Sequence, residues 1–313
     1  VTRCQPFDRA IMTLRDARSM AGAWLAAALW CAGGAGQADA ALSADALRTI
    51  RHLPIQHNGR TKPFDSFARE TLQHLTGSPR HGAQDPVETV RGILASPERW
   101  QAEPLLAVPF VPLREALGLG PKTARVSYDQ LIETRALMRR LPAIVEKQRR
   151  DEKLSMLEQE TMDAFDRFVT FSNLMEHKLA IVPPPTALVR EWQPILKPAG
   201  YPMERQRAFR DAWSAWLDAL REGQPEAVEA AASHLSQALQ SANPAAHPAR
   251  WRLRLEVLYN RAQPFQIAAL LYGIAALGLF AGLASARRQA AQASAAVGMR
   301  VCWAAALLHA AGI

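Results

Sequence analysis

Cysteine is scarce in this chain of 313 residues, and its long central part has none. The three cysteines are Cys4, Cys31 and Cys302. Residues 32–301 therefore cannot form a disulfide framework, a CxxC redox site, a cysteine-ligated zinc site or a CxxCH haem-attachment site.

Motifs for catalysis and nucleotide binding are missing as well. The chain contains no GxSxG, P-loop or GxGxxG, so the sequence does not support nucleophilic hydrolysis, nucleotide binding or dinucleotide chemistry. Its histidines lack the HxxxH and HxxEH spacings of a zinc-binding helix. We therefore expect no catalytic residue and no metal site in this chain, and an independent exported enzyme ranks last among the hypotheses.

Positive charge is in excess but scattered. The chain carries 37 Lys and Arg against 29 Asp and Glu, for a formal net charge of +8. Nucleic-acid-binding proteins gather basic residues into a patch or stripe, whereas these residues are spread along the sequence. The composition therefore argues against a nucleic-acid partner, and an apolar content of 49% is sufficient for a packed core.

The first forty residues have the pattern of a secretory signal peptide. Arg15 and Arg18 precede the apolar run AGAWLAAALWCA, and the small residues Ala38 and Ala40 fit the last positions before a cleavage site. This pattern predicts a signal peptide over residues 1–40, with an uncleaved anchor as the alternative. The following domain would then be exported.

The second membrane signal is PFQIAALLYGIAALGLFAGL, residues 264–283, which contains no charged residue. At about 1.5 Å per residue this segment reaches roughly 30 Å, the thickness of the bilayer's hydrocarbon core. We predict a transmembrane helix; a buried core helix is the alternative. Residues 284–300 are expected to form a cytoplasmic loop, and 301–313 to begin a second, truncated transmembrane helix of a longer protein.

Between the two membrane signals, residues 41–263 show one helical pattern after another. Asp85 and Ser127 are expected N-caps, and one long helix is expected from Leu141 to the prolines at 183–185, its charged middle forming a solvated face with ion pairs. The only strand candidate, LLAVPFVPL, contains prolines that favour an extended connector. The expected fold class is all-α: an exported multi-helix domain followed by transmembrane helices.

The segment HLPIQHNGRTKPFDSFARETL places His57, Arg60 and Lys62 just before an expected helix. Gly59 suits a tight turn, and Pro63 suits the first turn of a helix. A turn and an amphipathic helix account for the segment without explaining three basic or imidazole groups at a helix N-terminus, where the macrodipole disfavours cations. The sharper hypothesis is that they face an anion: a haem propionate, a lipid headgroup or an acidic side chain of a partner.

His309 falls in the expected second membrane helix. A polar side chain inside a membrane usually faces a protein interior or serves a function. The imidazole could bind haem iron or hydrogen-bond to a neighbouring helix, and the sequence leaves both alternatives open.

Two passages, LPIQHNGRTKPFDSFARETLQHLTG and RLRLEVLYNRAQPFQIAALLYGIAALGLFAGL, resemble the exported domain and first span of cytochrome c biogenesis proteins of the CcsA/ResC type. The matching positions are Gln56, His57, Gly59, Arg60, Lys62, Pro63, Phe67, Ala68 and Glu70, then Glu256, Tyr259, Asn260, Arg261, Pro264 and Phe265. The resemblance extends more loosely over most of residues 48–283.

This resemblance implies a component of a cytochrome c synthetase (haem lyase) in the cytoplasmic membrane, with its large domain on the periplasmic side. Such a component delivers haem to apocytochrome c beside a second, ResB-like assembly subunit. The family's haem ligands would lie beyond residue 313, so this chain alone is not expected to be catalytic. The alternative is an exported helical scaffold or adaptor in another membrane complex.

Overall fold

The computed structural model describes residues 47–186, 189–284 and 288–311. Helices dominate these residues, and the six strands among them are at most four residues long. The all-α expectation is therefore confirmed for the described part of the chain. The expected signal peptide, residues 1–40, lies outside it.

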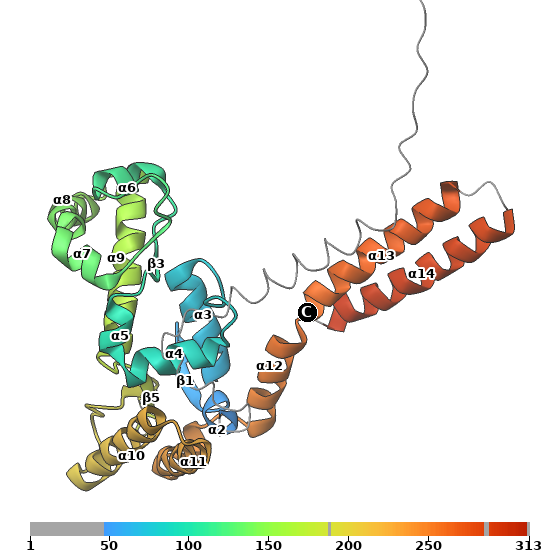
Figure 1. Cartoon of the computed structure of the whole chain (residues 1–313). Helices are drawn as coiled ribbons and strands as arrows, with labels where there is room; N and C mark the ends of the chain where they lie inside the picture. Colours follow the sequence, from blue (N-terminus) through green and yellow to red (C-terminus); the bar gives the residue numbers. More distant parts are fainter. Residues whose placement is uncertain (1–46, 187–188, 285–287, 312–313) are drawn as a thin grey trace, which may run out of the picture. The chain divides into compact units, whose positions relative to one another are not determined.

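The helices follow one another along the chain, as the colours of Figure 1 indicate. They are α2 (Arg48–Arg51), α3 (Phe64–Thr76), α4 (Pro86–Ala95), α5 (Pro97–Gln101), α6 (Val111–Ala116), α7 (Tyr128–Thr134), α8 (Ala136–Arg149), α9 (Met156–Met175), α10 (Met203–Glu222), α11 (Pro225–Ala242), α12 (Arg250–Ala262), α13 (Pro264–Ala284) and α14 (Arg288–Ala311), with a short 3₁₀ helix, η1 (Pro244–Ala246). The strands form three antiparallel pairs: β1 (Pro54–His57) with β2 (Arg60–Pro63), β3 (Leu106–Ala107) with β4 (Arg125–Val126), and β5 (Ala180–Val182) with β6 (Gln193–Pro194).

The β1–β2 hairpin occupies the segment expected to be only a turn. Its register runs from Pro54 opposite Pro63 to His57 opposite Arg60. The two residues between the strands, Asn58 and Gly59, have φ values of 51° and 74°, the left-handed pair that a tight Asn-Gly hairpin turn requires. The expected turn is present, but the strands that flank it were missed.

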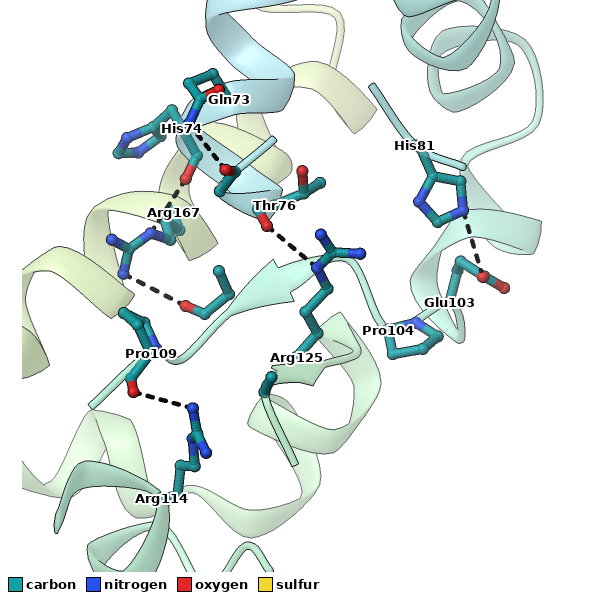
Figure 2. Close-up of a pocket in the computed structure, with 13 residues that line it drawn as sticks. Gln73, His74, Thr76, His81, Glu103, Pro104, Pro109, Arg114, Arg125 and Arg167 are labelled. Carbon is teal, nitrogen blue, oxygen red and sulfur yellow. Dashed lines mark hydrogen bonds and ion pairs between the residues drawn. The ribbon is translucent and has the colours of Figure 1, made fainter. Parts of the chain in front are cut away.

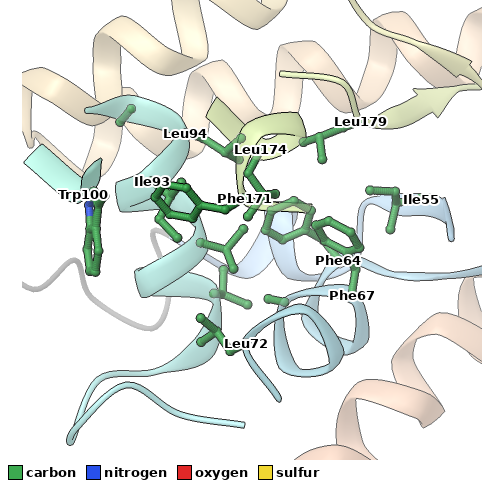
Figure 3. Packing of buried hydrophobic residues seen from close by; sticks show 14 of the residues in the cluster. Ile55, Phe64, Phe67, Leu72, Ile93, Leu94, Trp100, Phe171, Leu174 and Leu179 are labelled. Atoms are coloured by element: carbon green, nitrogen blue, oxygen red, sulfur yellow. The ribbon is translucent and has the colours of Figure 1, made fainter. Parts of the chain in front are cut away.

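The hydrophobic core brings together α3, α4 and α9, as Figure 3 shows. Phe64 and Leu72 of α3, Ile93 of α4 and Phe171 of α9 are each at most 1% exposed. Removing each such side chain from water stabilises the fold by about 2 kcal/mol before the cost of ordering it. This packing anchors α3, the helix on which the candidate site is built.

The expected helix caps are present. The Asp85 side chain accepts a hydrogen bond from the backbone N–H of Val87 at the start of α4. Ser127 caps α7 and forms a capping box with Gln130, in which each side chain binds the other's backbone N–H. These local interactions depend on neighbouring residues alone, which is why sequence reasoning identifies them.

The single long helix expected from Leu141 to residue 185 is wrong. The structure has two helices there, α8 and α9, followed by strand β5. Asp151 has a φ of 56°, which ends the first helical segment, and a Ser155–Glu158 capping box starts the second. The expected ion pairs in the charged middle are confirmed, among them Lys147 to Glu158 at 2.7 Å.

Helices α13 and α14 pack against each other through small residues. Ala268, Ala275 and Ala305 are buried, and a Cβ atom added at Gly298 would lie 3.0 Å from the carbonyl oxygen of Ala275. Leu277, by contrast, is 72% exposed. Among the described residues, one helical stretch, Pro244–Phe280, which includes α12 and most of α13, is long and apolar enough to cross a bilayer.

The expected loop over residues 284–300 is wrong in its secondary structure. Helix α14 begins at Arg288 and continues to Ala311, so the second helix starts well before residue 301. Residues 288–300 are rich in alanine, a strong helix former, and this propensity extends the helix through a stretch that its polar residues marked as a loop. The apolar part of α14, Ala295–Leu307, is too short to pass the same test for a membrane span.

Candidate functional site

The β1–β2 hairpin brings the three residues of the anion hypothesis together. His57 and Arg60 lie directly opposite each other at the end of the hairpin, and Lys62 follows on the same strand as Arg60. The Lys62 side chain is only 4% exposed, whereas that of Arg60 is 55% exposed. The hairpin therefore holds one buried and one accessible cation beside α3.

Glu70, on the second turn of α3, faces all three residues. Its carboxylate accepts a hydrogen bond from Lys62 Nζ at 2.5 Å, and it lies 3.7 Å from both His57 Nδ1 and Arg60 Nη2. Asp65, in the first turn of the same helix, is the acidic side chain that suits the positive end of the helix dipole. Lys62, at least, is therefore paired with an acid of the helix that it precedes.

A second carboxylate reaches the hairpin from α12. The Arg60 guanidinium donates two hydrogen bonds to Glu256, each 2.9 Å long, in the paired geometry that favours arginine over lysine. Ser66 Oγ donates to the same carboxylate at 2.6 Å. Asn260, one turn further along α12, donates to Ser66 Oγ at 2.8 Å. We call Arg60, Ser66, Glu256 and Asn260 the α12 clamp.

A fully buried carboxylate lies beneath the clamp. Asp65, in the first turn of α3, accepts hydrogen bonds from Arg51 at 2.9 Å, from Arg69 at 3.0 Å and from Asn260 at 3.1 Å. Arg51 also pairs with Asp85, the N-cap of α4, at 2.9 Å. A buried charge is tolerated only when it is paired and hydrogen-bonded, and this network meets both conditions.

A pocket of about 370 Å³ opens between α3 and α12. It is lined by Arg60, Ser66, Arg69, Glu70, Glu256, Tyr259 and Asn260. Two guanidinium groups and two carboxylates line the same space, so their charges balance. The structure thus supplies an anion for the predicted cluster from within the chain, and an external anion or partner at His57, Arg60 and Lys62 stays a prediction.

Charge within the cluster depends on burial. Loss of hydration lowers the pKa of His57, and the Lys62 charge lowers it further, while Glu70 acts in the opposite direction. The imidazole is therefore neutral at neutral pH. The hydrogen bond that Arg60 donates to Glu256 raises the pKa of Arg60, so the guanidinium stays charged. His57 is thus the uncharged member of the predicted triplet.

A second cavity, of about 830 Å³, lies at the other end of α3, and Figure 2 shows its arginines, Arg114, Arg125 and Arg167. Arg125 donates to the carbonyl oxygen of Thr76 at 3.1 Å, and Arg167 donates to that of His74 at 3.1 Å. These carbonyls belong to the last turn of α3, where they lack partners within the helix and the dipole favours cations.

The third arginine of this cavity binds loop carbonyls. Arg114 donates to Val108 and Pro121 at 2.6 Å each and to Pro109 at 2.9 Å. The nearby His81 imidazole lies 3.6 Å from Glu103. The arginines here therefore hold backbone segments together, a role that composition alone does not reveal.

The structure places His309 near the start of α13. Its exposed ring lies edge-on to Phe265, with ring centroids 5.4 Å apart, and 6.2 Å from the ring of Tyr272. It lines neither of the two cavities described above. Within the described ranges, no three His, Cys, Asp or Glu side chains are grouped as metal ligands. A haem-related role for His309 stays a prediction.

Sequence reasoning found the basic half of the cluster and missed the roles of its acidic half. The sequence-based hypothesis assigns no role to Asp65 or Ser66, and it includes Glu70 and Glu256 only as matching positions of the resemblance. The available signal was that both resembling passages carry a glutamate. Pairing Arg60 with Glu256 across 196 residues of sequence required the fold.

Comparison with known proteins gives one partial similarity. A stretch of 64 residues is 34% identical to Protein NrfI of Wolinella succinogenes. The match covers 20% of this chain and 7% of that protein, so the chain corresponds to a small part of its relative. No family model matches the chain.

Proposed function

We propose that this chain takes part in the maturation of c-type cytochromes. One observation carries the proposal: the two passages that resemble cytochrome c biogenesis proteins of the CcsA/ResC type meet in space through the α12 clamp. Arg60 and Ser66 come from the first passage, and Glu256 and Asn260 come from the second. Arg60, Glu256 and Asn260, which match the family's pattern in two distant passages, thus belong to one connected site together with Ser66.

The clamp has a mechanical role in this proposal. It holds α12 against α3 and the hairpin, and α12 ends one residue before α13, the uncharged helix expected to span the membrane. The helical body is thereby held next to the membrane segment, on the periplasmic face of the cytoplasmic membrane. From there it docks apocytochrome c or a ResB-like subunit, so that haem delivered by other parts of the machinery meets its acceptor.

The partial similarity to Protein NrfI is consistent with a role in cytochrome c maturation and goes no further than that. The resemblance assigns no haem ligand to a residue of the α12 clamp. The proposal therefore assigns positioning to this part of the protein and leaves haem binding and thioether formation to other segments.

The test is a set of clamp variants of the full-length protein in a bacterium that carries it as its own assembly factor. We expect Glu256→Ala and Arg60→Ala to reduce the amount of c-type cytochrome, measured by haem staining of membrane proteins after electrophoresis, while immunoblotting shows the protein still in the membrane. Arg149→Ala is the matched control, because this arginine on α8 is 75% exposed and lies outside the clamp.

Lys62 is a poorer choice for this test. Its side chain is nearly buried and bonded to Glu70, so replacement by alanine should lower the amount of folded protein and obscure a functional effect. If deletion of the whole gene leaves c-type cytochromes at normal levels, the proposal is wrong. A defect in a different envelope complex would then favour the scaffold hypothesis.

A further inference from the structure

Helix α12 has two different faces. Leu253 and Val257 are 7% and 4% exposed and pack against the helical body, on the side that also carries Glu256 and Asn260 of the clamp. Trp251, Leu255 and Leu258 lie at i, i+4 and i+7, on the opposite side of the helix, and are 62%, 56% and 62% exposed. This second side is a continuous apolar stripe that the described part of the chain leaves uncovered.

The stripe is flanked by arginines. They are Arg252, Arg254 and Arg261, and none of the ion pairs formed among the described residues includes any of them. Arg250, at the start of the helix, instead donates a hydrogen bond to Gln240 of α11 at 2.9 Å. Arg252 lies over the Trp251 ring, with its guanidinium carbon 5.4 Å from the ring centroid. The one acidic residue of the helix, Glu256, faces the clamp. The outward side of α12 is therefore apolar along its middle and positive along its edges.

The position of α12 in the chain indicates what covers it. Gln263, with a φ of 47°, ends α12, and α13 begins at the next residue, Pro264. The start of a membrane-spanning helix lies at the level of the lipid headgroups, so α12, one residue away, is within reach of that layer. Helices with arginines on the polar side and Trp and Leu on the other typically lie in this interfacial layer.

We infer that α12 lies in the membrane interface, with Trp251, Leu255 and Leu258 inserted among lipids and its arginines bound to anionic phospholipid headgroups. This inference rests on the membrane insertion of α13 in the proposed function. The α12 clamp holds the other face of the same helix, so α12 connects the helical body to the membrane surface as well as to the span.

The test uses the full chain, with its three cysteines changed to serine, reconstituted in nanodiscs. Single spin-labelled cysteines at positions 255 and 258 report on the stripe. Position 277, whose leucine is 72% exposed on α13, is the lipid reference, and position 149, whose arginine is 75% exposed on α8, is the water reference. The probes are molecular oxygen, which collects in lipid, and a nickel chelate, which stays in water.

We expect the oxygen-to-nickel collision ratio at 255 and 258 to be several-fold above that at 149 and below that at 277. The ratio should rise when phosphatidylglycerol is added to phosphatidylcholine discs, and this rise should be lost in the triple variant Arg252→Gln, Arg254→Gln, Arg261→Gln and at high salt.

Three outcomes would overturn the inference, and each is recognisable. A water-like ratio at 255 and 258 with a lipid-like ratio at 277 means that α13 spans the membrane and α12 does not touch it. Low collision rates with both probes at 255 and 258 mean that a protein surface covers the stripe. A water-like ratio at 277 removes the premise that α13 is in lipid, and with it the membrane part of the proposed function.

Discussion

The two ends of α3 use arginine in opposite ways. At the N-terminal end, Arg51 and Arg69 bind the buried carboxylate of Asp65, and Arg60 binds Glu256. At the C-terminal end, Arg125 and Arg167 bind backbone carbonyls of the last helical turn. The helix itself sets the difference, because its N-terminus favours acidic side chains and its C-terminus leaves carbonyls without partners.

This comparison separates two kinds of stabilisation. The N-terminal end depends on pairs of opposite charges, and the Asp65 carboxylate among them is fully buried. Removing one partner therefore leaves an unpaired charge in the protein interior. The C-terminal end depends on charge-assisted hydrogen bonds to neutral groups, whose loss costs less per interaction. The first end should therefore be sensitive to single substitutions of acidic residues, and the second should be more tolerant.

The largest effect is expected from Asp65→Ala. This change leaves Arg51 and Arg69 without their buried carboxylate and should lower the free energy of unfolding by about 3 kcal/mol. Denaturant titration in detergent, followed by circular dichroism, measures the change. Asp211→Ala, at an exposed position of α10, is the control and should be close to neutral. A loss from Asp65→Ala no larger than that from Asp211→Ala would mean that the buried network contributes little.

The next effect is expected from Arg167→Ala at the opposite end of α3. The change removes hydrogen bonds to the carbonyls of His74 and Ala107, which join α9 to α3 and β3, and should cost about 1–2 kcal/mol by the same titration. Arg149→Ala again serves as the matched arginine control. A loss as large as that from Asp65→Ala would contradict the distinction drawn between the two ends.

A smaller effect is expected from Arg60→Ala. The Arg60 side chain is 55% exposed, so solvent screens its ion pair and the global loss should be about 0.5–1 kcal/mol. The local effect should be clearer: amide hydrogen exchange in α12 should accelerate, while α10 stays protected. Arg60→Lys keeps the charge but loses the paired geometry. Its amide exchange rate in α12 should therefore lie between those of the unsubstituted protein and Arg60→Ala. Unchanged exchange in α12 would show that the clamp does not hold this helix.

The smallest expected effect is a loss of stability at acidic pH. Burial is the main cause that lowers the pKa of His57, His177 and His247 below the ordinary value of 6.5. The unfolded chain therefore binds protons before the folded chain does. The contribution of the three neutral imidazoles to stability is fully present above about pH 6.5. It is lost as the pH falls from there through the pKa values that these histidines have in the folded chain.

Thermal unfolding at a series of pH values checks this expectation. The midpoint should fall as the pH drops below 6.5, and His177→Gln should reduce the slope because glutamine does not titrate. The His57→Gln variant reports on the N-terminal end of α3 alone. A midpoint that rises on acidification through this range would contradict the assignment of neutral, buried imidazoles.

Much of the helical framework was predictable because its signals are local. Asp85 and Ser127 cap the helices that they precede, and the apolar residues of α3 and α4 follow the helical period into the core. The break between α8 and α9 was not predicted, although Ser155 and Glu158 form a capping box of the same kind. Continuous helical periodicity on both sides concealed it.

The hairpin shows a different limit. Asn58-Gly59 is among the strongest short-range signals for a two-residue hairpin turn, but the flanking strands are short, and Lys62 is nearly buried although it carries a basic side chain. Without an alternating apolar pattern, the strands had no signature of their own. Their existence depends on pairing with each other and on the ion pair that Lys62 forms with Glu70.

What the sequence alone determined is therefore the helical class, the caps, the apolar stretch near the end of the chain and the presence of three basic or imidazole groups before α3. These features follow from propensity, periodicity and charge within short windows. The tertiary structure decided which anions those groups meet, because Glu256 and Asn260 reach Arg60, Ser66 and Asp65 only after nearly two hundred residues have folded between them. Long-range ion pairs have no local pattern, since their energy depends on distance and burial in space.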